Sequence, residues 1–516
     1  MLRPQRQMLF ASSKLSNSFP ACVRGFCLLL LCFAPGIYTA HAQAIDAHLS
    51  VVSLEPARVR IEGKRAVVTR DWSFRNSYAG VVNLGERIEN LSLTNDSGAL
   101  VTVSKLAPGE YRAKEPCARF SYEVRLDAPE NVADAAYVSW ISETRAVLML
   151  NDLLPRLPEE KEANSAAVRF TLPLNWQIVS LESRTANDTF VVKDAARAVF
   201  FVGQNLRRRE QRIGAMTFTL ATTGEWAFTD EDAMRSIADV LREHIKTNGG
   251  VPRENAMLML TAFPRAAGAS RWSAETRGGT TLLLLGQAAS RTAALAGLSL
   301  PLAHELFHLW IPNGVALDGN YDWFYEGFTQ YQALRTCVRL GTLTFQEFLN
   351  AIGAAFDAYH QMIDRDRFSL VEASERRWMG APGIIYHKGL LTAFLFDLTV
   401  RGKTGGKRSL DDVYRELFRS YRRTEVRTDG NAAVIKTLSE ALETPFFAQQ
   451  YVTSASTIDL SSIIAPFGLK IEPGSVRARL AVVDSPTRKQ RDLLRQLGYN
   501  NETHAKSPRV ERKKEK

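Results

Sequence analysis

Two histidines and a glutamate stand close together in the segment Pro301–Trp310, which reads Pro-Leu-Ala-His-Glu-Leu-Phe-His-Leu-Trp. His304 and His308 are four positions apart, so on a helix their side chains lie on the same face, about one turn apart. One tetrahedral zinc ion can bind both imidazoles, and Glu305 can reach a zinc-activated water without binding the metal. The pattern indicates a zinc site with Glu305 as general base. The alternative is a buried helix that happens to carry two histidines.

A third ligand is expected, because catalytic zinc takes three protein ligands and leaves one position open for water. Glu326 lies 18 positions after His308, in the aromatic-rich segment Tyr321–Tyr331. An antiparallel return of the chain would bring its carboxylate back to the metal, and a carboxylate among aromatic residues needs a polar partner. We predict that Glu326 completes the site of one zinc ion. The alternative is an ordinary exposed glutamate on a helix.

Capping signals predict the elements that position these residues. Ser299 can cap a helix and Pro301 suits its first turn, so we expect the histidine helix to begin there. Asn313 and Gly314 end that helix, and a second helix begins near Asp322. The two helices would then carry the metal ligands on facing sides.

The chain changes character near residue 226. Residues 43–222 hold short alternating apolar runs separated by Gly, Asn, Asp and Pro, which predicts a β-rich domain resembling an antiparallel sandwich. Residues 223–472 begin with a helix capped by Thr229, continue with two apolar strands and are mainly helical from Leu298 onwards. The predicted fold is therefore multidomain, with a β-rich N-terminal domain and a mainly α catalytic domain.

The two ends differ from the rest in charge. Residues 1–42 combine a basic, acid-free lead, an apolar run from Phe26 to Phe33 and small residues around His41, as in a secretory signal peptide. Residues 473–516 read as a basic, disordered tail. A charge of +4 on 1–42 and +6 on 486–516 accounts for the whole net charge of +10. The remainder is neutral, which argues against nucleic-acid binding.

Cysteine usage fits export. Three of the five cysteines would leave with the signal peptide, and Cys117 and Cys337 remain. They are 220 positions apart, and neither has a partner at metal-ligand spacing. An exported protein could pair them, but we interpret them as two isolated structural cysteines.

The phrases His-Glu-Leu-Phe-His-Leu-Trp and Tyr-Glu-Gly-Phe-Thr-Gln-Tyr resemble the glycyl aminopeptidase family of gluzincin metallopeptidases. A third segment, Tyr386-His387-Lys388-Gly389, agrees with that family. The resemblance implies a thermolysin-like (α+β) catalytic domain behind a β-rich domain. It also implies that Tyr386 stabilises the transition state. His387 is a weaker candidate for supporting the site.

The chain departs from the usual pattern of the family. The usual Gly-Leu-Glu-His segment is not recognisable, and its counterpart is the stretch Glu275–Thr281, where Glu275 is a candidate for binding the substrate's N-terminus. The C-terminal PDZ domain of many family members is not expected here.

The strand 279–285 could form a sheet edge to which an extended peptide adds itself, so Gly278, Gly279 and Thr280 are candidate substrate-binding residues.

Together these features predict an exported, periplasmic or secreted, zinc metallopeptidase that acts on peptides or proteins, and aminopeptidase action is expected. Two alternatives remain open: a catalytically inactive exported peptide-binding protein on the same fold, and a zinc hydrolase of non-peptide substrates. No membrane span is expected after signal cleavage, because no later segment is long and apolar enough. The sequence does not decide residue specificity, exo- or endopeptidase action, or the oligomeric state.

Overall fold

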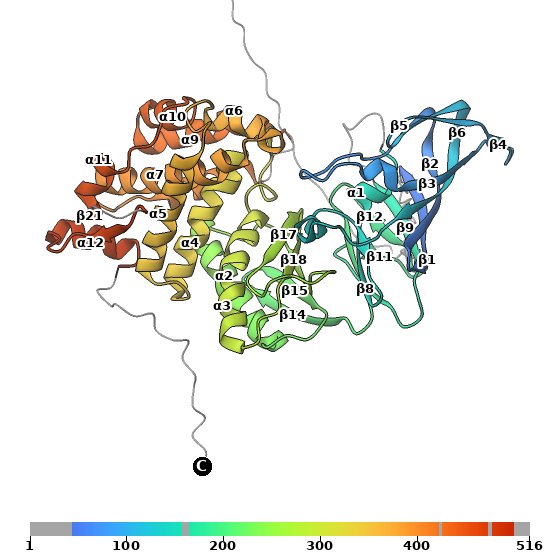
Figure 1. Ribbon diagram of the computed structural model, residues 1–516, viewed down its shortest axis with the longest axis horizontal. Coiled ribbons are helices and arrows are strands. Elements are labelled where there is room, and N and C mark those ends of the chain that lie inside the picture. Colours follow the sequence, from blue (N-terminus) through green and yellow to red (C-terminus); the bar gives the residue numbers. More distant parts are fainter. Residues whose placement is uncertain (1–43, 157–164, 423–425, 473–476, 500–516) are drawn as a thin grey trace, which may run out of the picture. The chain divides into compact units, whose positions relative to one another are not determined.

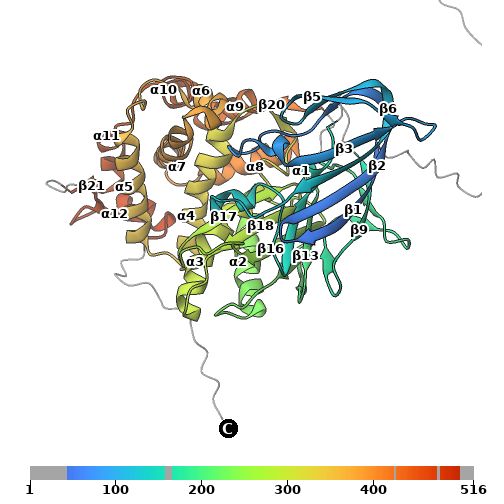
Figure 2. The ribbon, with the colours of Figure 1, turned by 45° about the vertical axis from the view of Figure 1, so that its right-hand side comes forward.

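The computed structural model describes residues 44–156, 165–422, 426–472 and 477–499, so the predicted signal peptide lies outside the described residues. Within them, β-sheets form the N-terminal part and helices form most of the C-terminal part (Figure 1 and Figure 2). This is the multidomain arrangement that the sequence predicted. Three sheets and a group of helices position the candidate site, and they are described in chain order.

The first sheet has the strand order β11-β12-β9-β1-β2-β6-β3-β4, with β5 paired to β6. Its pairs are antiparallel, as predicted, except that β1 and β9 run parallel. Alternate residues of β1, including Ala47 and Leu49, face the domain core. The strands are β1 Ile45–Leu54, β2 Ala57–Ser73, β3 Ile88–Thr94, β4 Leu100–Val101, β5 Val103–Ala107, β6 Glu110–Arg125, β9 Ala166–Thr171, β11 Ser183–Arg184 and β12 Phe190–Val192.

The second sheet has the order β10-β13-β8-β7 and is apolar on both faces. Ala146 and Leu148 of β8 pack into the core of the first sheet, whereas Val147 and Met149 pack against residues of the third sheet such as Met257. Because this sheet is covered on both sides, its strands lack polar alternation. The strands are β7 Trp140–Ile141, β8 Arg145–Met149, β10 Gln177–Val179 and β13 Val199–Gly203.

The third sheet has the order β14-β15-β16-β18-β17 and corrects two expectations. The expected domain boundary after residue 222 is wrong, because it would separate β15 from β16, and these two strands pair in parallel within this sheet. The expected edge strand 279–285 is also wrong, since β18 lies between β16 and β17, and β17 forms the edge. The strands are β14 Arg207–Ile213, β15 Met216–Thr222, β16 Asn255–Ala262, β17 Trp272–Arg277 and β18 Thr280–Leu285.

Two helices follow the capping rules, but one begins earlier than expected. Helix α2 (Asp230–Asn248) begins after Thr229 with a capping box, as predicted. Helix α3 (Arg291–Glu305) is capped by Ser290, whose side chain accepts a hydrogen bond from the backbone N–H of Ala293. The expected start at Ser299 is therefore wrong, and Pro301 lies inside the helix at the cost of one backbone hydrogen bond.

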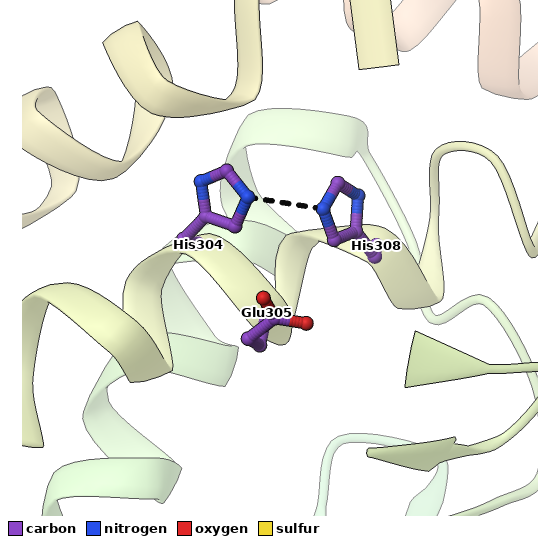
Figure 3. Close-up of side chains that lie close together, drawn as sticks. All are labelled: His304, Glu305 and His308. Atoms are coloured by element: carbon purple, nitrogen blue, oxygen red, sulfur yellow. Dashed lines mark hydrogen bonds between the residues drawn. The ribbon is translucent and has the colours of Figure 1, made fainter. Parts of the chain in front are cut away.

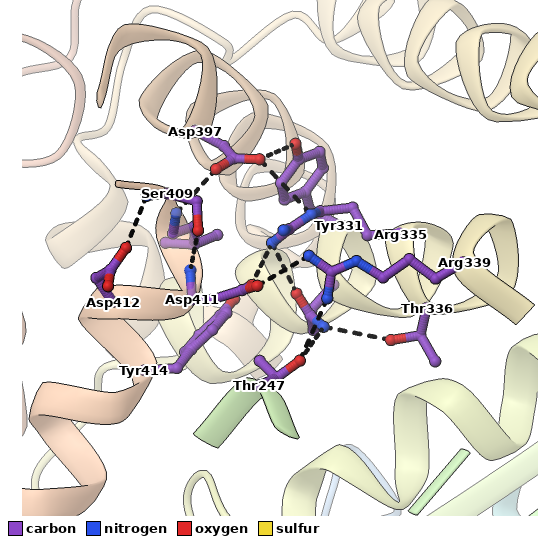
Figure 4. Close-up of polar contacts among 12 residues, drawn as sticks. Thr247, Tyr331, Arg335, Thr336, Arg339, Asp397, Ser409, Asp411, Asp412 and Tyr414 are labelled. Atoms are coloured by element: carbon purple, nitrogen blue, oxygen red, sulfur yellow. Dashed lines mark hydrogen bonds and ion pairs between the residues drawn. The ribbon is translucent and has the colours of Figure 1, made fainter. Parts of the chain in front are cut away.

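A buried ionic network joins the helices behind the site (Figure 4). Arg335 of α4 lies 2.8 Å from Asp411 at the start of α8 and 3.6 Å from Asp397 of α7, while Arg339 of α4 also contacts Asp411 at 2.8 Å. These pairs fix three helices relative to one another. The C-terminal helices are α4 Thr329–Leu340, α5 Phe345–Gln361, α6 Leu370–Glu375, α7 Gly389–Thr404, α8 Leu410–Tyr421, α9 Gly430–Leu442, α10 Phe446–Tyr451 and α11 Ser461–Ile464.

The segment 477–499 is folded, so the expectation of a disordered tail is wrong for these residues. Strand β22 (Leu480–Val482) pairs with β21 (Leu469–Ile471), and helix α12 (Arg488–Gln496) follows. Leu493 and Leu494 of α12 are buried in the core of the helical part. The sequence analysis missed this helix because most of its residues are basic or polar. Its apolar face consists of the two leucines, and these anchor it to the core.

Cys117 and Cys337 are both buried and both free, as expected for isolated structural cysteines. Among the described residues, none of the helices combines the length and the apolar character that crossing a membrane requires.

Candidate metal centre and active site

Helix α3 brings the two histidines together at its C-terminal end (Figure 3). His304 lies in the last turn, and His308 lies in the following 3-10 turn, Phe307–Leu309. Their Nε2 atoms are 3.2 Å apart. The buried His244 of α2 contacts the carbonyl oxygen of Ala303 at 3.0 Å and thereby holds the helix just before His304.

Glu326 completes a triangle of ligand atoms. It lies in a π-helical turn, Trp323–Phe328, and its Oε2 is 3.4 Å from Nε2 of His304 and 3.8 Å from Nε2 of His308. Zinc binds nitrogen and oxygen ligands at about 2.0–2.2 Å, which in a tetrahedron places neighbouring ligand atoms about 3.4 Å apart. The three distances therefore fit one zinc ion.

Neighbouring groups orient two of these ligands. Nδ1 of His308 contacts the carbonyl oxygen of Ile311 at 2.9 Å, which leaves Nε2 for a metal. Arg377 contacts Oε1 of Glu326 at 3.0 Å, which leaves Oε2 facing the histidines. Burial alone would raise the pKa of Glu326, but Arg377 and the histidines outweigh it and hold this pKa below its usual value. The carboxylate is thus ionised, as a metal ligand must be.

Glu305 lies beside the two histidines, and its carboxylate is buried. Thr276 of the edge strand β17 donates a hydrogen bond from Oγ1 to Oε2 of Glu305 at 3.0 Å. Burial raises the pKa of Glu305 to about 7, while the nearby His304 opposes this rise. A carboxyl group of this kind can exchange protons near neutral pH.

Tyr386 reaches the same place from a second π-helical turn, Ile384–Lys388. Its hydroxyl oxygen accepts a hydrogen bond from Nη2 of Arg377 at 2.7 Å. Burial is the main cause that raises the pKa of Tyr386 well above its usual value, so the hydroxyl keeps its proton. The tyrosine can therefore donate a hydrogen bond to a substrate oxygen.

Two glycines allow these two turns to touch. A methyl group added to Gly327 would lie 2.6 Å from the Cα atom of Gly389 and 2.6 Å from the carbonyl oxygen of Ile385. Gly327 follows Glu326, and Gly389 closes the turn that carries Tyr386. The absence of side chains at this contact thus brings the third ligand and the tyrosine together.

A cavity of about 1040 Å³ is lined by the five predicted metal-binding and catalytic residues, namely His304, Glu305, His308, Glu326 and Tyr386. Strand β17 forms one wall, and Glu275 lies on that strand. Tyr78 of the N-terminal domain donates a hydrogen bond to Oε1 of Glu275 at 2.6 Å. The site therefore lies between the β-rich and helical parts, and both contribute to it.

The other substrate-binding candidates lie elsewhere. Gly278 and Gly279 form the turn between β17 and β18, and Thr280 begins β18. None of the three belongs to the cavity wall, which takes residues Trp272–Arg277 from β17 instead. In this hairpin β17 is the outer strand. The residues of β17, which precede the turn, therefore face the cavity, whereas the residues of the turn and of β18 do not.

Three residues at the site were not predicted from the sequence. Arg377 joins Glu326 to Tyr386, Thr276 holds Glu305, and Tyr78 holds Glu275. Thr276 and Arg377 lie in stretches with no metal-site motif. Tyr78 comes from a domain that had no expected role in the site.

Solved structures with a similar fold include an aminopeptidase N family protein and an M1 zinc metallopeptidase. An aminopeptidase N family protein from Idiomarina loihiensis superposes with a TM-score of 0.71 at 16% identity, over 84% of this chain and 81% of that chain. A variant of the M1 zinc metallopeptidase of Deinococcus radiodurans bound to Tyr-Ser-Ala superposes with a TM-score of 0.52 at 15% identity, over 81% and 95%. The likeness confirms a two-domain fold of the aminopeptidase N type.

The family match lies on the segment that carries the site. Residues 298–388 match the model of the M61 glycyl aminopeptidase family, which confirms the resemblance found in the sequence. The matched segment contains both histidines, Glu305, Glu326 and Tyr386. No curated protein matches the chain.

Proposed function

We propose that this protein is an exported zinc metallopeptidase that removes residues from the N-termini of peptides. The observation that carries the proposal is the triangle of His304, His308 and Glu326 atoms, at ligand spacing for one zinc ion, beside the buried Glu305. A site that served structure alone would close the fourth metal position and would not need a base.

The bound zinc would supply Lewis acidity that polarises the scissile carbonyl and lowers the pKa of a water molecule. Glu305 accepts a proton from the attacking water at its carboxylate and passes that proton to the leaving amine. Thr276 holds this carboxylate in place throughout. The scissile C–N bond breaks as the nitrogen gains the proton.

Tyr386 stabilises the oxyanion that develops on the carbonyl oxygen. Its hydroxyl oxygen already accepts a hydrogen bond from Arg377, so its own proton is free to point into the cavity. Arg377 thus acts as a positioning residue for both the tyrosine and Glu326. A preformed donor of this kind favours the transition state over the ground state.

Glu275 is the basis for the aminopeptidase assignment. Its side chain is 22% exposed and lines the cavity that holds the metal ligands. A carboxylate there can bind the free ammonium group of a peptide, whose extended backbone can add to the edge strand β17. Tyr78 donates a hydrogen bond to Glu275 and so holds this carboxylate in the wall of the cavity, where it can bind the end of a peptide chain.

The decisive experiment combines metal analysis with substrate panels. Purified protein should contain one zinc ion and release the first residue of aminoacyl-coumarin amides and free peptides, but not of N-acetylated peptides. The Glu305→Gln variant should keep its zinc and lose at least about 1000-fold in kcat. Zinc binding without peptide cleavage by the unmodified protein would defeat the proposal, and cleavage within N-acetylated peptides would indicate an endopeptidase.

Export is part of the proposal and is supported by the composition of residues 1–42. Mass spectrometry of the protein isolated from cell fractions tests it. We expect a mature N-terminus near residue 43 in the exported fraction. Full-length protein retained in the cytoplasm would contradict the proposed export and would leave the proposed peptidase activity untouched.

A further inference from the structure

A second, smaller cavity adjoins the metal centre and is walled mainly by apolar side chains. It measures about 320 Å³ and shares Trp272, His304 and Gln330 with the larger cavity. Its remaining walls come from α3, α4, α5, α7 and His387 of the π-helical turn Ile384–Lys388, so it opens into the helical part rather than toward the N-terminal domain. The metal ligand His304 thus stands where the two cavities meet.

Small residues on two helices create this space. Ala333 on α4 and Ala351, Ala354 and Ala355 on α5 line it, where longer side chains would fill it. An apolar cavity of about 150 Å³ already accommodates a benzene ring, so there is room here for an aromatic or large aliphatic side chain.

Two large apolar side chains at the entrance are partly uncovered. Trp272 and Leu300 are each 38% exposed, although both line the apolar cavity. Exposed apolar surface beside a cavity is typical of a ligand-binding position rather than of a packed core. The cavity shares His304 with the metal centre, so a side chain that fills the cavity would lie beside the bond that is cleaved.

The position of Glu275 fixes which substrate residue reaches the second cavity. Glu275 lines the larger cavity and not the smaller one, and His304 lines both. If the N-terminal ammonium group of the peptide binds Glu275 and the scissile bond lies at the metal, the residue after that bond extends past His304, toward the smaller cavity. The larger cavity then holds the first residue of the peptide.

We propose that the smaller cavity binds the side chain of the second residue of the peptide, directly after the cleaved bond, and selects bulky apolar residues there. The inference rests on the proposed function, since it takes the cleavage site and the direction of the peptide from it. Burial of a phenyl ring should favour the transition state for such substrates by about 10-fold or more over glycine.

Three dipeptide amides test the proposal with the zinc-loaded protein: Ala-Phe-amide, Ala-Gly-amide and Phe-Gly-amide. Released amino acid is quantified by chromatography to give kcat/KM. We expect at least about a 10-fold preference for Ala-Phe-amide over Ala-Gly-amide. Ala354→Phe should fill the cavity from its exposed rim and reduce that preference at least about fivefold.

A matched control separates this effect from a general change in the protein. Ala296 on α3 is exposed like Ala354 but lies outside both cavities. Ala296→Phe adds the same ring on a helix surface and should leave the preference unchanged. Thermal unfolding of both variants verifies that each remains folded.

The outcomes distinguish this inference from the proposed function. Equal kcat/KM values for Ala-Phe-amide and Ala-Gly-amide would overturn the inference while leaving an active aminopeptidase. A preference for Phe-Gly-amide that Ala354→Phe removes would show that the cavity binds the first residue, which also overturns it. If the zinc-loaded protein cleaves none of the three and no other peptide, the proposed function itself fails.

Discussion

Thr276 contacts Glu305 twice: its Oγ1 lies 3.0 Å from the carboxylate Oε2 and 3.0 Å from the backbone oxygen of the same residue. The threonine belongs to the edge strand β17 and the glutamate to the end of helix α3. One hydroxyl group therefore sets the position of the proposed general base relative to the strand along which the substrate would lie.

Replacing Thr276 by alanine should lower kcat about 10-fold, because a hydrogen bond to a charged group contributes about 1.5–3 kcal/mol. Zinc content should stay at one ion, since no metal ligand is touched. Thr276→Ser keeps the hydroxyl group and should recover most of the activity. A serine variant as slow as the alanine variant would show that the hydroxyl group is not the cause.

Arg377→Ala should weaken zinc binding about 10–100-fold, because the arginine orients Glu326 from the side opposite the metal. It should also lower kcat, since the same guanidinium holds Tyr386. Competition with a chelator measures the affinity. Arg376→Ala is the matched control, because Arg376 is exposed and stacks on Phe368 instead. Equal zinc affinity in both variants would refute the role of Arg377.

Gly389→Ala should separate the two π-helical turns, because the new methyl group would lie 2.9 Å from the Cα atom of Gly327. We expect kcat to fall at least about 10-fold as Tyr386 moves away from the substrate oxygen. Gly405→Ala is the control, because a methyl group added at Gly405 would meet no atom within 4 Å. The positive φ of Gly405 adds local strain, but the replacement causes no crowding. Unchanged kcat in Gly389→Ala would contradict the close-contact argument.

His244 should make the stability of the metal-free protein depend on pH. Burial lowers its pKa to about 3 in the folded chain, against about 6.5 in the unfolded chain. The unfolded chain therefore binds more protons between these values, so stability is complete above about pH 6.5 and is lost as pH falls toward about 3. At pH 5 the loss should be about 2 kcal/mol.

Urea unfolding at pH 7.5 and pH 5 in the presence of a chelator measures this loss. His244→Gln keeps a donor for the carbonyl oxygen of Ala303 but cannot titrate. The variant should therefore lose about 2 kcal/mol less than the unmodified protein over the same pH interval. An identical loss in both proteins would assign the effect to other groups.

The grouping of His304, His308 and Glu326 could be predicted from the sequence because local geometry largely fixes it. Two histidines four positions apart share one face of a helical segment wherever it packs, and Glu326 needed only one antiparallel return of the chain. The supporting residues could not be predicted in this way. Arg377 reaches Glu326 across 51 positions, and the contact exists only once the 3-10 turn Arg377–Met379 has packed beside the π-helical turn that carries Glu326.

The predicted start of helix α3 was wrong because packing outweighed a local signal. Ser299 and Pro301 suit a helix start, but Ser290 caps the helix earlier in the chain. Packing decided otherwise, because Ala294 and Leu298 of the first turns are buried in the core. The order β16-β18-β17 likewise depends on the hairpin folding outwards, which the apolar sequence of β18 does not reveal.

The hydrogen bond from Tyr78 to Glu275 joins parts of the chain that lie 197 positions apart. Mutations at one of these positions would therefore be tolerated only with a matching change at the other. Among homologues, the two positions should vary together, and exchanging the β-rich domain between relatives should impair peptide cleavage unless the tyrosine–glutamate pair is inherited intact. The two halves of this protein should consequently evolve as one unit.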